Sequence, residues 1–263
     1  MRRSGLWWRG PVVAVILAVV VCVAAQTGAR AEFYDGMELV ALPPEPGADY
    51  DTPILGPGAG IGNLVAALDA LYRDSPASVA AIEAIKRDAD VTIVYAAAYP
   101  PSRSMRALNV ARFSPGDGGG TPNFTVIIGR HGIKWPPKAL AGAIAHELVG
   151  HAAQHLAGRH LTLRAFDAEC EAMLLQERAH QDLGINKLSR LMVQVRQSME
   201  WRFCGDFKTY ARKFHPDADG LWDRVNPDVP RLLDIFDVYV RDRRGPGVTA
   251  AADLSGLRSA TRF

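Results

Sequence analysis

The sequence predicts a mainly helical α+β fold that contains one small antiparallel sheet. Apolar residues recur at helical three and four spacing through much of the chain, whereas three short strand-like runs lie together between residues 91 and 128. A chain of 263 residues, 48% of them hydrophobic, can bury a sizeable core. We therefore expect one domain over residues 60–243, with two segments before it and a tail after it.

The first 31 residues have the features of a signal peptide. Basic residues precede an apolar run over residues 12–25, and Ala29-Arg30-Ala31 offers small residues at the two positions that a signal peptidase reads. The run is shorter than the ~20 residues that a membrane-spanning helix needs. We therefore expect cleavage after Ala31 and a secreted or periplasmic protein, which would contact a membrane only if this segment stayed uncleaved.

Residues 32–59 are rich in proline and glycine, which predicts an extended segment without regular secondary structure. Apolar residues at three and four spacing then predict a helical hairpin, with helices over residues 64–72 and 79–85. Ser75-Pro76 marks the start of the second helix.

Three strand-like runs follow, over residues 91–95, 108–113 and 124–128. The glycine-rich residues 114–120 join the last two runs, which predicts a small antiparallel sheet. This glycine run leads into a strand and not into a helix, so it lacks the geometry of a phosphate-binding loop.

A helix is expected to begin after Trp135-Pro136-Pro137, because proline is tolerated in a first helical turn, and to end at Gly158. Residues 244–263 are expected to form a flexible tail. Between Gly158 and this tail, helical patterns occur in three segments, residues 161–183, 187–214 and 229–240.

Residues 145–152 read AHELVGHA and concentrate the residue types of zinc chemistry. Two neutral imidazoles, from His146 and His151, can hold Zn²⁺ together with one carboxylate and leave a fourth position for water, whose pKa the metal lowers. A second carboxylate outside the coordination sphere can take the proton as that water attacks a carbonyl group. Glu147 is the candidate for this general base.

The two histidines are five residues apart. A regular helix places two side chains on one face when they are four residues apart, so this spacing is one residue too long. At ~100° per residue, five steps turn the second ring roughly 140° away from the first. A single π-type turn would bring both rings to one metal, and such turns are frequent at functional sites. Gly150 would relieve the crowding of that turn.

The six-residue motif His-Glu-x-x-Gly-His resembles the zinc-binding helix of the dipeptidyl-peptidase III family, and HELVGH matches it at every fixed position. In that family a glutamate followed by Cys, any residue and Ala supplies the third ligand, and Glu169-Cys170-Glu171-Ala172 reads the same way. This chain is much shorter than the members of that family. The short gap between His151 and Glu169 is similar to that of small gluzincin peptidases. The resemblance thus implies a zincin-like domain with Glu169 as third ligand, but not the release of dipeptides.

Two alternatives for the ligand set remain open at this stage. His151 and His155 are four residues apart and could share a metal on a regular helix with Glu147, although His146 would then be unused. Glu171 could replace Glu169, because two residues on a helix differ by ~200° and only one can face the metal.

Further residues are candidates for supporting roles. Tyr210, Arg212 and His215 could donate to the oxyanion that forms on an attacked carbonyl, with Tyr210 and His215 taken as the catalytic pair. Asp167 could orient an imidazole, although an exposed acid is the simpler expectation. Residues 124–128 are expected to be the edge strand that binds the substrate backbone.

Cys170 and Cys204 are the two cysteines that remain after removal of the signal peptide. In an oxidising compartment they could pair, and the alternative is two separate buried thiols. If a turn near residues 184–186 joins two antiparallel helices, the two cysteines lie at similar heights along the pair.

The sequence therefore predicts an exported zinc metallopeptidase that acts on peptide or protein substrates. The net charge of +2 and the scattered basic residues argue against a nucleic-acid partner. The alternative is a non-catalytic exported protein in which the metal staples two helices and the domain binds a partner. An open coordination position beside a cleft would favour the enzyme, and a closed site would favour the staple.

Overall fold

The computed structural model of the chain describes residues 28–101, 110–116, 121–218 and 225–244. Most of the expected signal peptide (residues 1–27) and of the expected tail (residues 245–263) therefore lies outside the described residues. None of the helices in the described ranges is long and apolar enough to cross a membrane.

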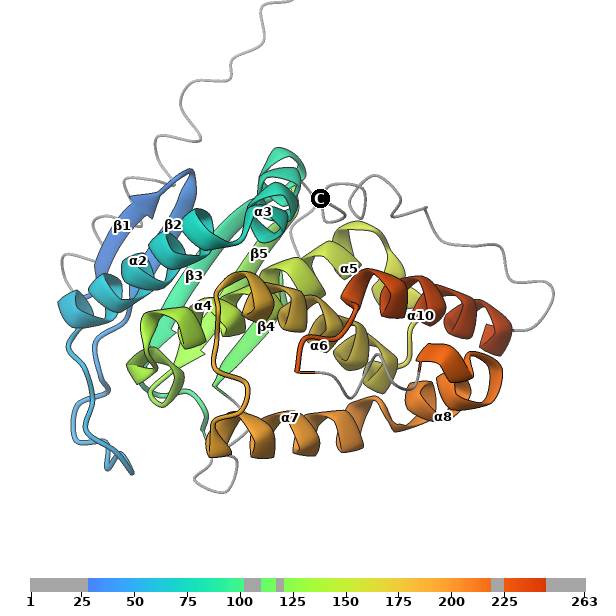
Figure 1. Cartoon of the computed structure of the whole chain (residues 1–263). Coiled ribbons are helices and arrows are strands. Elements are labelled where there is room, and N and C mark those ends of the chain that lie inside the picture. Colours follow the sequence, from blue (N-terminus) through green and yellow to red (C-terminus); the bar gives the residue numbers. More distant parts are fainter. Residues whose placement is uncertain (1–27, 102–109, 117–120, 219–224, 245–263) are drawn as a thin grey trace, which may run out of the picture.

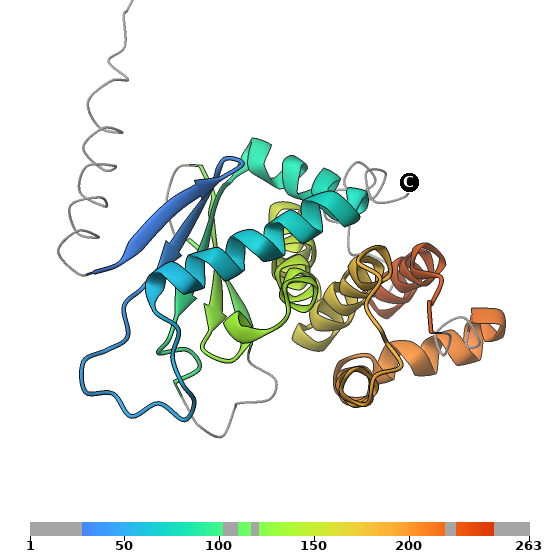
Figure 2. The same cartoon turned by 60° about the vertical axis from the view of Figure 1, so that its left-hand side comes forward.

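The fold is α+β and mainly helical, with a five-stranded mixed sheet in the order β1-β2-β3-β5-β4. The helices gather on one side of this sheet (Figures 1 and 2). Strands β2, β3 and β5 run parallel, and the two edge strands β1 and β4 pair antiparallel with their neighbours. The strands are β1 Arg30–Tyr34, β2 Met37–Ala41, β3 Asp90–Ala96, β4 Ala111–Pro115 and β5 Asn123–Gly129.

The expectation of a small antiparallel sheet is wrong, because the sheet is mixed. The segment after Ala31 was expected to lack regular secondary structure, and it contains strand residues instead. Strands β1 and β2 form a hairpin there around Asp35 and Gly36, which have φ of 46° and 81°. Positive φ at both central residues is what a two-residue hairpin turn requires, and Asp-Gly is a favoured sequence for it. The central strands are parallel because a helical hairpin returns the chain between β2 and β3.

Strands β2, β3 and β5 alternate buried and partly exposed residues, as a sheet with one covered face requires. Their buried side chains pack against helices α2, α3 and α4 in one core. The predicted helical hairpin is confirmed as α2 Pro57–Asp74 and α3 Pro76–Asp88.

The central helix is also confirmed, from α4 Pro137–Ala145 through a π-helical segment η3 His146–Ala152 to α5 Ala153–Leu156. It stops before Gly158, which has a φ of +66°. Segment η3 contacts strands β4 and β5 on one side and helix α6 Ala165–Asp182 on the other.

Two short 3₁₀ segments, η2 Gly132–Lys134 and η4 Arg159–Leu161, flank the central helix. The helical pattern of residues 187–214 corresponds to two helices, α7 Arg190–Phe203 and α8 Gly205–Phe214, and α10 Val229–Arg244 follows. A second core joins α6, α8 and α10. Cys170 and Cys204 form a disulfide within it, which decides between pairing and separate thiols.

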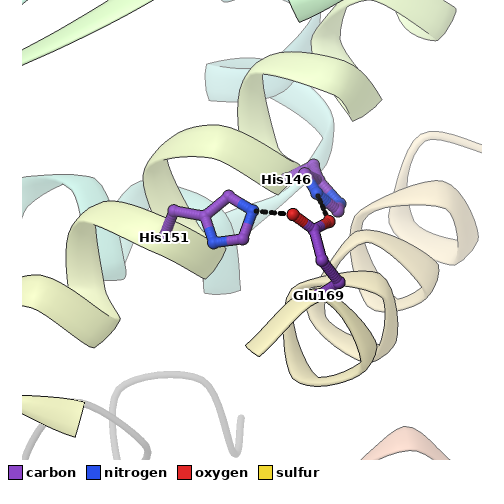
Figure 3. A group of neighbouring side chains, drawn as sticks. All are labelled: His146, His151 and Glu169. Atoms are coloured by element: carbon purple, nitrogen blue, oxygen red, sulfur yellow. Dashed lines mark ion pairs between the residues drawn. The ribbon is translucent and has the colours of Figure 1, made fainter. Parts of the chain in front are cut away.

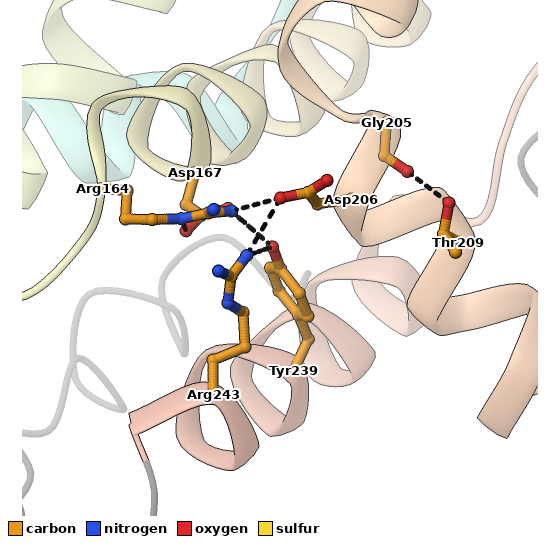
Figure 4. Close-up of polar contacts among 7 residues, drawn as sticks. All are labelled: Arg164, Asp167, Gly205, Asp206, Thr209, Tyr239 and Arg243. Carbon is orange, nitrogen blue, oxygen red and sulfur yellow. Dashed lines mark hydrogen bonds and ion pairs between the residues drawn. The ribbon is translucent and has the colours of Figure 1, made fainter.

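A polar network reinforces this second core (Figure 4). Arg164 at the start of α6 pairs with Asp167, and Tyr239 of α10 donates a hydrogen bond to the same carboxylate. Asp206 of α8 accepts from Arg164 and from Arg243. Asp167 is therefore buried, in contrast to the exposed acid expected from the sequence, and its partners are Arg164 and Tyr239 and not an imidazole.

Candidate metal centre

The π-helical turn that the histidine spacing requires is present. Segment η3 spans the whole HELVGHA sequence, so the chain carries one extra residue between two stretches of α-helix. His146 and His151 consequently project from the same side, with their ring centroids 5.0 Å apart.

Gly150 has a second role that the sequence did not indicate. A β-carbon at position 150 would lie 2.6 Å from the Cβ of Ala172, which belongs to α6. The glycine of the first motif and the alanine of the second therefore face each other where the two helices are in contact. Their small size allows Glu169, one helical turn before Ala172, to reach the histidines.

Figure 3 shows the carboxylate of Glu169 directed between the two imidazole rings. One carboxylate oxygen lies 3.4 Å from Nε2 of His146, and the other lies 3.5 Å from Nε2 of His151. One potential ligand atom from each of these residues lies within 4.8 Å of the other two, so the group could hold a metal ion.

These separations fit metal ligands better than they fit hydrogen bonds. A charge-assisted N–H···O bond is normally ~2.7 to 2.9 Å long. Ligands placed ~2.0 to 2.1 Å from a tetrahedral zinc ion lie about 3.3 Å apart, which is close to the two observed nitrogen–oxygen distances. Two imidazole nitrogens and one carboxylate oxygen are also a common donor set for a catalytic zinc site.

The electrostatics of the group favour a charged Glu169. Burial alone would raise its pKa, but the two histidines outweigh this effect and lower it. Burial likewise opposes the charged form of His151, yet its contact with Glu169 and the charge of Glu147 raise the pKa of this histidine to about 9. A cation is thus already favoured beside Glu169, and a divalent metal would displace the proton of His151.

His146, His151 and Glu169 are called the triad below. Glu147 lies beside the triad but is not part of it. Its side chain is buried, and burial raises its pKa despite the nearby imidazoles of His146 and His151. A hydrogen bond with the backbone of Phe113, in β4, opposes the shift. A buried carboxylate with a raised pKa has the proton affinity that a general base near neutral pH needs.

The triad opens into a cavity of about 860 Å³. Glu147, His146, His151 and Glu169 all line it, with the edge strand β4 on one side and helix α7 on another. The expectation that residues 124–128 form the edge is wrong, because β5 is paired on both sides and β4 is the edge strand. The lining residues from β4 are Ala111, Arg112 and Phe113.

The alternative ligands have other partners. The ring of His155 stacks on that of His160 at 3.8 Å between centroids, and burial lowers its pKa to about 4. Glu171 is buried and forms an ion pair with Arg159 at 2.8 Å. The structure therefore groups His151 with His146 and Glu169, and not with His155 or Glu171.

The proposed oxyanion donors are not brought to the triad. Tyr210 of α8 donates a hydrogen bond to Asp242 of α10, and its ring lies 6.0 Å from that of His215. Neither these two residues nor Arg212 are among the described residues that line the cavity.

Two residues near the site were missed by sequence reasoning. Tyr99 lines the cavity beyond the end of β3, and burial together with the charge of Glu147 raises its pKa. Gln154 contacts Nδ1 of His151. The position of Gln154, three residues after the candidate ligand His151 on the same helix, is the one signal that could have found it.

Comparisons of the chain with protein-family models, with curated proteins and with solved structures found no match.

Proposed function

We propose that the protein is a zinc-dependent peptidase in which His146, His151 and Glu169 hold the metal and Glu147 is the general base. The observation that carries this proposal is the pair of 3.4 and 3.5 Å separations between one carboxylate and two imidazoles, at the mouth of a cavity. When bound there, zinc would polarise a carbonyl oxygen and make a water molecule more acidic.

The side chains have distinct tasks in this proposal. Glu147 accepts a proton on its carboxylate and passes it to the leaving amine, as a base of raised pKa can do. Tyr99 lines the cavity, whereas Tyr210 and His215 do not, so Tyr99 is the better candidate to donate to a developing oxyanion. The sequence-based assignment of that role to Tyr210 and His215 therefore has no support from their positions.

The edge strand β4 supports a peptide as substrate. Its pairing partner is β5, it stands last in the sheet order, and three of its residues line the cavity. An extended peptide could add to that edge by backbone hydrogen bonds and so lie across the triad. The cavity beside the triad argues against a closed site that merely staples two helices.

The experiment is a comparison of the zinc-loaded protein with its Glu147→Gln variant. We expect one zinc per chain in both, and peptide hydrolysis that falls by several orders of magnitude in the variant. Hydrolysis that stays unchanged would remove Glu147 from the mechanism. Zinc bound equally by wild type and a His151→Ala variant would remove the ligand set.

We also propose that the protein is exported. Cys170 and Cys204 form the kind of bond that persists in oxidising compartments. Cleavage after Ala31 would remove the first two residues of β1 and leave the rest of that strand. Sequencing the amino terminus of the mature protein should therefore find Glu32 as its first residue. A mature protein that still begins with Met1 would contradict cleavage.

A further inference from the structure

Gln154 links the two segments that carry the triad. It is buried on α5, directly after the π-helical segment. Its side-chain amide lies 3.1 Å from Nδ1 of His151 on one side. On the other side it donates to the backbone carbonyl of Ala168, the residue before Glu169, at 2.8 Å.

The orientation of this amide is determined by its partners. Nε2 of Gln154 faces the carbonyl oxygen of Ala168 and, at 3.1 Å, a carboxylate oxygen of Glu171. Both partners can only accept hydrogen bonds while Glu171 is ionised, so the nitrogen of the amide must point toward them. Its oxygen therefore faces His151, and Nδ1 of His151 must be the donor.

The Glu171 carboxylate is held in turn by Arg159. Arg159 donates to both oxygens of the Glu171 carboxylate, at 2.8 and 3.1 Å, and also contacts Asp237 of α10 at 3.2 Å. Glu171 is almost completely buried, and both of its carboxylate oxygens accept hydrogen bonds from the Arg159 guanidinium, which can only donate. The chain of contacts thus runs from α10 through Arg159, Glu171 and Gln154 to His151.

We propose that Gln154 is a positioning residue for the metal centre, a role that rests on the proposed function. Its oxygen accepts from Nδ1–H of His151, so that Nε2, the nitrogen facing Glu169, is the one that would give up its proton to a metal. Through Ala168 it also sets the distance between His151 and the start of the Glu169 side chain. An amide therefore performs the task that a carboxylate often performs for a metal-binding histidine.

The test compares Gln154→Met with Gln181→Met. The methionine side chain has a length similar to that of glutamine, but it donates no hydrogen bond and accepts one only weakly. Gln181 is a matched control, because it lies on α6 and also donates to a backbone carbonyl, that of Pro227. Gln154→Asn is a second variant, with a polar but shorter side chain, for use if the methionine variant does not fold.

Zinc affinity is measured by competition with a chromogenic chelator, and the His151 ring is observed by ¹⁵N NMR in the zinc-loaded proteins. We expect Gln154→Met to weaken zinc binding by ~10- to 100-fold. It should also abolish the slowly exchanging Nδ1–H signal of His151, whereas Gln181→Met should change neither.

Wild-type affinity and an unchanged Nδ1–H signal in folded Gln154→Met would overturn the positioning role and leave the proposed function intact. A wild-type protein that binds no zinc would overturn the proposed function and this role together.

Discussion

Replacing Gly150 by alanine is the sharpest test of how the two motifs meet. The new β-carbon would lie 2.6 Å from Cβ of Ala172, whereas ordinary contacts begin at 3.4 Å, so the helices must separate by at least about 0.8 Å. The next nearest atom, Cα of Ala172, is backbone and cannot turn away. Overpacking of this kind costs about 1 to 3 kcal/mol of folding free energy.

The same separation should weaken metal binding, because α6 also carries Glu169. Urea unfolding of the zinc-free protein gives the stability change, and chelator competition gives the zinc dissociation constant. Gly62→Ala is the control, since a β-carbon there meets no atom within 4 Å. That control lies inside α2 and should be neutral or stabilising by up to about 1 kcal/mol.

A double variant with Ala172→Gly separates the contact from other effects. It should be less destabilised than the sum of the two single variants, because removal of one methyl group makes room for the other. A Gly150→Ala protein as stable as wild type, with unchanged zinc affinity, would refute the close approach of the two helices.

Three further predictions concern stability. Cys204→Ser should lower the free energy of unfolding by about 4 kcal/mol under oxidising conditions, because the disulfide closes a loop with a sequence separation of 34; equal urea midpoints in variant and wild type would contradict this. Burial alone would raise the pKa of Glu177, but contacts with His180, Lys187 and Arg196 outweigh it and lower this pKa to about 2. The contribution of Glu177 to the free energy of unfolding should therefore be complete above about pH 4.5 and be lost as the pH falls toward 2. Urea midpoints at pH 5 and pH 3 should therefore differ less in Glu177→Gln than in wild type, and equal differences would exclude this role. Phe207→Ala should cost about 3 to 5 kcal/mol in the second core, measured by the same unfolding assay, and a loss below about 1 kcal/mol would contradict its close packing.

The features that the sequence predicted well depend on local geometry. The distortion between His146 and His151 follows from the rotation per residue of a helix, and the structure contains it as η3. The choice of Glu169 over Glu171 followed the Glu-x-x-Ala resemblance and agrees with the group that the structure forms.

The features that were missed depend on contacts between distant segments. The prolines and glycines of residues 32–59 concealed the hairpin, although Asp35-Gly36 was a local signal for it. The order of the sheet, with β5 inside and β4 at the edge, is set by pairing between strands far apart in the chain. The position of Tyr210 also depends on a distant segment, because its hydroxyl donates a hydrogen bond to Asp242 of α10.

The proposed function depends on one metal ion bound between His146, His151 and Glu169. Anomalous diffraction at the zinc edge, from crystals of the zinc-loaded protein, tests it directly. We expect a single strong peak ~2.0 to 2.2 Å from Nε2 of both histidines and from a Glu169 oxygen, with one coordination position facing the cavity. A peak held by other residues, or none at the π-helical turn, would contradict it.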